Sequence, residues 1–125
     1  MPIVVLVGAG GMIGAVMRYL VGRGVFVATG AAWFPYSTLA VNVTGCFLIG
    51  FLAGFAEARQ TLSPETRAFL LVGLLGGFTT FSAFGLETVS LVRQGEVAAG
   101  LGNIALQLVL GLAAVWLGLT IAQRV

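Results

Sequence analysis

Residues 73–84 read Gly-Leu-Leu-Gly-Gly-Phe-Thr-Thr-Phe-Ser-Ala-Phe, and they lie within an uncharged stretch that covers residues 68–86. Two adjacent glycines followed by two β-branched threonines are poor helix formers. Inside a bilayer, a helix can break only where protein, water or ions satisfy the freed backbone groups. In transporters such breaks offer carbonyl oxygens to cations and half-helix N-termini to anions. The stretch therefore predicts a membrane helix that is broken where ions bind.

Two phenylalanines in this stretch are three positions apart. Phe81 and Phe84 therefore share one face of a helix. The edge of a Phe ring is electropositive. Ring edges aimed into a narrow path would attract a small anion without a full charge that would trap it. Ordinary aromatic packing is the alternative, but it explains only the rings and not the Gly-Gly-Phe-Thr-Thr break.

Outside this stretch, the charged residues divide the chain into long apolar runs. A membrane helix needs about 20 mostly apolar residues. We therefore expect an all-α integral membrane protein with a single membrane domain over residues 1–125 and with the third of its four helices broken mid-membrane. The expected spans are 3–22, 38–56, 67–92 and 98–121.

The composition disfavours several other classes of protein. Apolar types make up 59% of the 125 residues and charged types only 8%, whereas a soluble domain carries about 25% charged residues. A soluble enzyme, a nucleic-acid-binding protein and a disordered tail are therefore disfavoured. The chain has no His and one Cys, too few ligands for an ordinary zinc site. Without a nucleophile–base pair or a metal cluster, we do not expect an enzyme.

The connections between the spans are expected to be short. Residues 23–37 form the first connection and contain an aromatic cluster suited to the headgroup level of a membrane. Ser63 is expected to cap the third helix, with Pro64 as its first residue. Residues 93–96 are expected to form a tight turn.

The arginines are almost evenly divided between the two ends of the predicted bundle. One end holds three, and the other holds two, or three if Arg18 reaches the interface. Orientation normally follows an excess of Lys and Arg on the cytoplasmic side. Either six arginines are too few to decide the orientation, or the protein inserts both ways and pairs head to tail.

Gly8, Gly11 and Gly14 resemble a dinucleotide-binding loop at first sight. That fold also needs an acidic residue about 20 positions further on, and the first acid in the chain is Glu57. We therefore interpret these glycines as a packing face that lets membrane helices approach closely, and Gly50 and Gly54 as a second such pair.

Polar side chains within the spans are the other signal of function. Such groups usually face a partner or a water-filled path, because hydrocarbon cannot satisfy them. Thr and Ser can bond to their own helix, but Asn42 and Gln107 cannot easily do so. Both helix–helix hydrogen bonding and a permeation path remain open for these two residues. The polar residues within the spans are Arg18, Thr38, Asn42, Thr44, Thr79, Thr80, Ser82, Glu87, Asn103 and Gln107.

Three motifs together resemble one known family. Residues 76–84, Gly-Gly-Phe-Thr-Thr-Phe-Ser-x-Phe, resemble the signature of the small fluoride channels called Fluc or CrcB. Residues 10–19 contain the first-span motif G-x-x-G-A-x-x-R-Y, and residues 35–45 match the second-span motif P-x-S-T-L-x-V-N-x-x-G. Glu87 lies where the family has an acid after the phenylalanines. The resemblance covers all four spans.

This resemblance implies a fold and a function beyond the reasoning above. Members form antiparallel homodimers in the lipid bilayer, with two fluoride pores and a central structural sodium ion. The implied function is passive, fluoride-selective export across the cell (plasma or inner) membrane, which lowers fluoride toxicity in the cytoplasm.

The resemblance also implies roles for individual residues. Sodium would bind main-chain carbonyls of Gly76 and Thr79, and Arg18 would enrich anions at a pore mouth. Glu87 and Thr38 would give polar support. The expected fluoride path consists of Asn42, Phe81, Phe84, Ser82, Thr80, Gln107 and Asn103.

The chain departs from the family at a few positions. It has Ala83 where the family often has Thr, and Asn103 and Gln107 where the fourth span often has Tyr and Ser. Two other classes also fit a chain of this length. A small proton-coupled multidrug exporter needs a carboxylate in its first span, and this chain has none there. A structural membrane subunit would fit a broken helix without a transport role.

Overall fold

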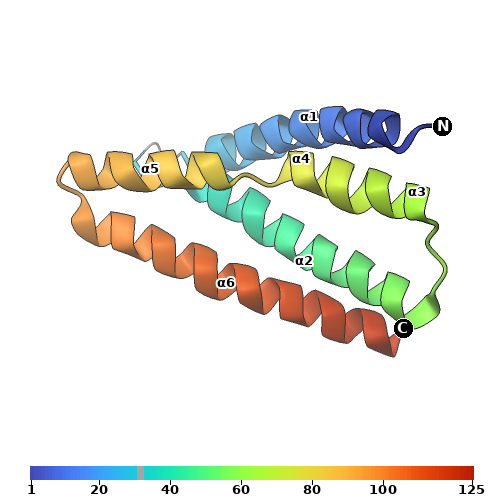
Figure 1. The fold of residues 1–125 in the computed structure, drawn as a ribbon. Coiled ribbons are helices and arrows are strands. Elements are labelled where there is room, and N and C mark those ends of the chain that lie inside the picture. The colour runs from blue at the N-terminus through green and yellow to red at the C-terminus, as the bar shows by residue number, and fades with distance from the viewer. Residues whose placement is uncertain (31–32) are drawn as a thin grey trace.

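The computed structural model describes residues 1–30 and 33–125, and every regular element in them is helical. Four helical segments are long and apolar enough to cross a membrane. They run alternately in opposite directions, so that both termini lie at one end of the bundle (Figure 1). The elements are α1 (Ile3–Thr29), α2 (Tyr36–Arg59), α3 (Pro64–Arg67), η1 (Ala68–Leu75), α4 (Gly76–Phe78), α5 (Phe81–Arg93) and α6 (Val97–Arg124).

The first helix is longer than the sequence indicated. We expected a connection over residues 23–37, but α1 continues to Thr29. The helix ends at Gly30, which has the left-handed conformation (φ 61°) that glycine adopts without strain and which donates its N–H to the Phe26 carbonyl at 3.0 Å. The apolar Val25, Phe26 and Val27 extend the membrane helix past Gly24, so the connection to α2 is short.

The second connection ends as predicted. The Ser63 hydroxyl accepts a hydrogen bond from the Thr66 amide at 3.1 Å, and Pro64 is the first residue of α3. Ser63 is therefore the predicted N-cap. Beyond α3, the backbone of η1 is wound as a π-helix, a rare form that often occurs near functional sites and that the residue pattern did not indicate.

Helix α1 packs against η1 through glycine. A Cβ atom at Gly14 would overlap the Leu74 carbonyl oxygen, and one at Gly10 would lie 2.9 Å from the Leu74 amide. Gly11 lies against Gly77. The predicted packing face was partly wrong, because a Cβ at Gly8 would meet no atom within 4 Å. The four-residue spacing of Gly10 and Gly14 places these two on one face.

Helix α2 packs along α6 in the same way. A Cβ at Gly50 would overlap the Val115 carbonyl, and one at Gly54 would lie 3.1 Å from the Ala122 Cβ. From the other side, Gly118 of α6 fits against the Phe47 carbonyl. The predicted pair Gly50 and Gly54 thus does form a close helix contact.

The outward faces of the single chain are apolar. Large exposed side chains include Val16 on α1 and Leu112 and Trp116 on α6. Such faces suit hydrocarbon or another copy of the chain, and the four helices make this a multi-pass membrane protein.

Candidate functional site

The third membrane segment is broken in the middle, as the sequence predicted. Thr79 (φ −85°, ψ 159°) and Thr80 (φ −148°, ψ 120°) are extended. The Thr80 hydroxyl accepts from the Ala83 amide at 3.1 Å and so caps the start of α5. The Thr79 hydroxyl donates back to the Leu75 carbonyl at 3.0 Å. Both ends of the break are thus fixed by threonine side chains.

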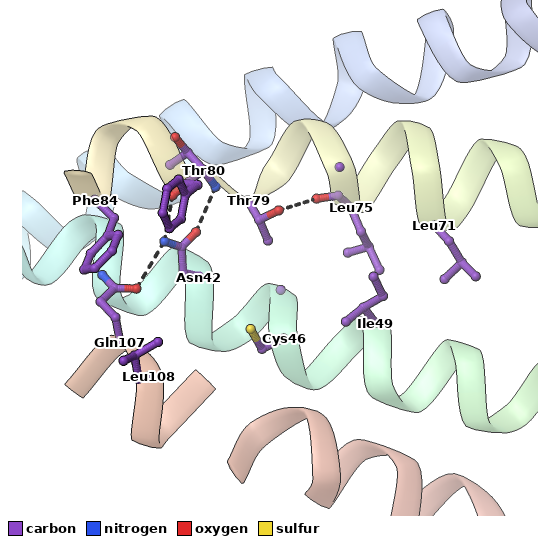
Figure 2. Close-up of a pocket in the computed structure, with 13 residues that line it drawn as sticks. Asn42, Cys46, Ile49, Leu71, Leu75, Thr79, Thr80, Phe84, Gln107 and Leu108 are labelled. Atoms are coloured by element: carbon purple, nitrogen blue, oxygen red, sulfur yellow. Dashed lines mark hydrogen bonds between the residues drawn. The ribbon is translucent and has the colours of Figure 1, made fainter. Parts of the chain in front are cut away.

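The amide of Asn42, on α2, replaces the backbone partners that Thr80 lacks. The Thr80 N–H donates to Asn42 Oδ1 at 2.9 Å, and Asn42 Nδ2 donates to the Thr80 carbonyl at 2.9 Å. Figure 2 shows Asn42 pointing from α2 toward the break. Because the backbone N–H can only donate, it fixes which end of the Asn42 amide faces it.

This fixed direction continues into α6. Asn42 Nδ2 also donates to Gln107 Oε1 at 3.2 Å (Figure 2). The carbonyl end of Gln107 therefore faces Asn42, and its NH₂ group points the other way. Gln107 Nε2 is buried and has no hydrogen-bond partner among the described residues. The chain of hydrogen bonds that begins at the broken backbone thus ends in an unused donor.

A groove of about 340 Å³ lies along these groups. Phe81 and Phe84 form one wall, with ring centroids 5.6 Å apart and planes tilted by 54°. The other lining residues are Asn42, Gly45, Cys46, Ile49, Leu71, Leu75, Gly76, Thr79, Thr80, Gln107 and Leu108. Apolar walls with a few convergent hydrogen-bond donors are typical of a selective binding site.

At the break, the carbonyls of Gly76 and Thr79 lose the backbone N–H groups that would bond to them in a regular helix. In an unbroken helix these carbonyls would accept from Thr80 and Ala83. Both amides donate to side chains instead, Thr80 to Asn42 and Ala83 to Thr80. Carbonyl oxygens are the ligands that alkali cations receive in selective membrane proteins. The carbonyl oxygens of Gly76 and Thr79 are therefore the kind of ligand that suits a sodium ion.

Arg18 reaches the same break from α1. Its Nε donates to the Gly77 carbonyl at 3.2 Å, at the C-terminal end of α4. A positive charge is favourable at a helix C-terminus. Arg18 also lines a second groove of about 400 Å³, together with Arg23, and Thr80 lines both grooves.

Glu87 and Thr38 lie in this second groove. The Thr38 hydroxyl donates to Glu87 Oε1 at 2.8 Å. Glu87 Oε2 is buried, and no described residue donates a hydrogen bond to it. The two predicted supporting residues are thus paired directly, between α2 and α5.

Two of the expected path residues do not line the first groove. Ser82 is exposed, with its hydroxyl 3.3 Å from the Thr80 hydroxyl. Asn103 is fully buried, and its Nδ2 donates to the Thr88 hydroxyl at 2.9 Å. The structure brings together Asn42, Thr80, Phe81, Phe84 and Gln107, with Gly76 and Thr79 beside them.

The sequence did not place Gly45 or Cys46 at the site: Cys46 was interpreted as a small packing residue, yet both residues line the groove. A Cβ at Gly45 would overlap the Thr79 side chain. The absence of a side chain at Gly45 therefore allows α2 to approach the break. Its signal in the sequence was its place in the motif Pro-x-Ser-Thr-Leu-x-Val-Asn-x-x-Gly.

Comparison with known families adds independent information. Residues 5–119 match the model of the family described as CrcB-like protein, Camphor Resistance (CrcB). The chain belongs to the CrcB family. This finding confirms the resemblance that the three motifs suggested.

Individual relatives match over nearly their whole length. A protein of Rhizobium meliloti (strain 1021), named fluoride-specific ion channel FluC, is 50% identical over 120 residues, which is 96% of this chain and 95% of the relative. Proteins with the same name from Renibacterium salmoninarum and Methylobacillus flagellatus are 46% and 44% identical, over 96% of this chain and 98% and 94% of their own. An ion channel converts no substrate, so these CrcB relatives are not enzymes.

Proposed function

We propose that this CrcB protein is a fluoride-selective channel that exports fluoride passively across the cell membrane and so lowers fluoride in the cytoplasm. The observation that carries the proposal is the buried amide donor of Gln107, a residue that lines the groove, for which the described residues offer no hydrogen-bond partner. Its direction is set, through Asn42, by the backbone N–H of Thr80. A fixed donor without a partner is a suitable site for an anion.

The other residues of the groove fit the same ion. Fluoride is small and strongly hydrated, so a path must replace its water with donors at close range. Gln107 offers an amide hydrogen, and Asn42 holds Gln107 in place because both of its own amide hydrogens are donated to the Thr80 carbonyl and to Gln107. The hydroxyl of Thr80, which lines both grooves, and the exposed hydroxyl of Ser82 beside it add further donors. The edges of Phe81 and Phe84 are electropositive and narrow the route without adding a charge. In this arrangement Arg18 and Arg23 concentrate anions at the mouth.

The channel is proposed to be an antiparallel homodimer with two pores. The groove is open on one side of the single chain, and Phe81 is 83% exposed. An aromatic ring at a conduction site needs a covering surface, and a second copy supplies one with the same apolar character. The nearly equal division of arginines between the two ends favours insertion in both orientations.

A structural sodium ion is proposed at the centre of this dimer, held by the carbonyl oxygens of Gly76 and Thr79. When bound, the ion would compensate the negative ends of the carbonyl dipoles that the break exposes. The chain's own residues hold the break in shape through Asn42 and Arg18.

The two competing functions have weaker support. A proton-coupled exporter would need a carboxylate in α1, and residues 3–29 contain none. A purely structural subunit would not need a series of hydrogen bonds that ends at an unpaired amide donor on Gln107, a residue of the groove.

Fluoride efflux from liposomes that contain only the purified protein tests the function. We expect rapid fluoride efflux and little chloride efflux. In Gln107→Glu, the side chain keeps the acceptor for Asn42 but replaces the free donor with a carboxylate oxygen. Fluoride efflux should fall by about tenfold or more, because a buried carboxylate oxygen without a partner then takes the place of the donor.

The exposed Gln123 gives the matched control, since Gln123→Glu adds the same charge away from the groove. It should transport as the parent does. Equal flux of fluoride and chloride through the parent, or no flux at all, would refute the channel.

A further inference from the structure

The buried Asn103 makes contacts that differ in kind from those of the groove residues. Its side chain is 0% exposed and lies on α6, four residues before Gln107. Asn103 Nδ2 donates to Thr88 Oγ1 at 2.9 Å, and the Thr88 hydroxyl donates to the Phe84 carbonyl at 2.8 Å. Two hydrogen bonds therefore connect α6 to the backbone of Phe84, whose ring lines the groove.

The direction of this relay is fixed. The single hydroxyl proton of Thr88 is committed to the Phe84 carbonyl, so Thr88 Oγ1 can only accept from Asn103. Asn103 must therefore present its NH₂ group to Thr88. Its Oδ1 is left buried, with no donor among the residues that the structure describes. The reverse orientation of the amide would place Asn103 Oδ1 against Thr88 Oγ1, and neither oxygen would then have a hydrogen to share.

Helix α5 packs closely on α6 beside this relay. A Cβ at Gly100 would lie 3.3 Å from the Thr88 carbonyl and 2.8 Å from Val92 Cγ2. A hydroxyl bonded to the carbonyl four residues earlier also bends a helix slightly. The turn of α5 that carries Phe84 is thus fixed both by packing and by a directed pair of hydrogen bonds.

We propose that Asn103 and Thr88 are positioning residues, which act through the Phe84 backbone to set the place of its ring in the groove, and that Asn103 is not itself part of the fluoride path. The proposal rests on the proposed channel function. It assigns the two fourth-helix amides different tasks: Gln107 offers a donor to the anion, and Asn103 holds the ring that narrows the route.

Flux of fluoride and chloride through Thr88→Val in liposomes tests this role. Valine has nearly the same shape but can neither donate to Phe84 nor accept from Asn103. We expect fluoride flux to fall about tenfold, the scale of one lost buried hydrogen bond, and the ratio of fluoride to chloride flux to fall as well. Thr88→Ser keeps the hydroxyl and should restore both quantities.

Thr120 provides the matched control. Its hydroxyl donates to the Trp116 carbonyl at 2.8 Å, which is the same bond made at an exposed place on α6. Thr120→Val should leave flux and selectivity at the parental values. Asn103→Leu should reproduce Thr88→Val, and the double variant should be no worse than either single one, since residues in one network are not additive.

The outcomes separate this inference from the channel proposal. A parent that carries no fluoride would refute the channel itself. A parent that conducts, with Thr88→Val and Thr88→Ser both at parental flux and selectivity, would overturn only the positioning role. Loss of flux in Asn103→Leu but not in Thr88→Val would also overturn it, because Asn103 would then act on the ion directly.

Discussion

At the scale of single residues, the amide of Asn42 has two tasks that cannot be separated. It satisfies both backbone groups of Thr80, and it orients Gln107. The residue that makes the break stable is thus the same one that orients the amide of Gln107, a residue of the groove. From the sequence, both helix–helix bonding and a permeation path were open for Asn42. The structure shows that it bonds between helices and also lines the groove, so one role does not exclude the other.

The two phenylalanines of the groove wall give the prediction at this scale. Phe81→Ile and Phe84→Ile keep bulk and apolar character but remove the electropositive ring edge. If the edges guide fluoride, each variant should assemble normally and transport much more slowly in the liposome assay. Phe55→Ile, on α2 and away from the groove, is the control. Parental flux in both variants would show that the rings only pack.

At the scale of elements, glycine decides which helices meet. Gly14 lies against the Leu74 carbonyl, whereas Gly8 on the same helix faces open space. Gly14→Ala should therefore destabilise the α1–η1 contact by about 1–3 kcal/mol, as overpacking does. Gly8→Ala should not lower stability. Thermal unfolding in detergent measures both variants, and equal loss in the two would contradict the assignment of the packing face.

The sequence predicted these elements unevenly. The break at Thr79 and Thr80 and the cap at Ser63 could be predicted, because each depends on the intrinsic properties of local residues. Three features could not be predicted: the extension of α1 to Thr29, the π-helical form of η1, and the packing of Gly10 where Gly8 was expected. These features depend on which face of one helix meets another, and a single-chain pattern of apolar residues does not specify that.

The same distinction holds for the candidate site. The motifs contained Asn42, Thr80, Phe81 and Phe84 of the groove. They did not show that Gln107 ends a directed chain of hydrogen bonds, or that the buried Asn103 is bonded to Thr88. The orientation of each side-chain amide depends on its hydrogen-bond partners, which lie up to 65 positions away in the chain.

At the scale of the whole molecule, charge gives the remaining prediction. The six arginines are almost evenly divided between the two ends, so their positive charge favours neither orientation in the membrane. Reporters fused to the C-terminus should signal from both sides of the membrane, and the purified protein should be a dimer. A single orientation together with a stable monomer would contradict the antiparallel arrangement.

The glycine contacts also have a thermodynamic consequence for assembly. In hydrocarbon, helices gain nothing from expelling water from one another, so they associate through close van der Waals contact. Freezing a side-chain rotamer normally opposes such contact, by up to about 2 kcal/mol for a long side chain. At Gly14, Gly50 and Gly118 the touching surface is backbone, which is already ordered within each helix. These helices therefore pair at their closest points with almost no loss of side-chain entropy.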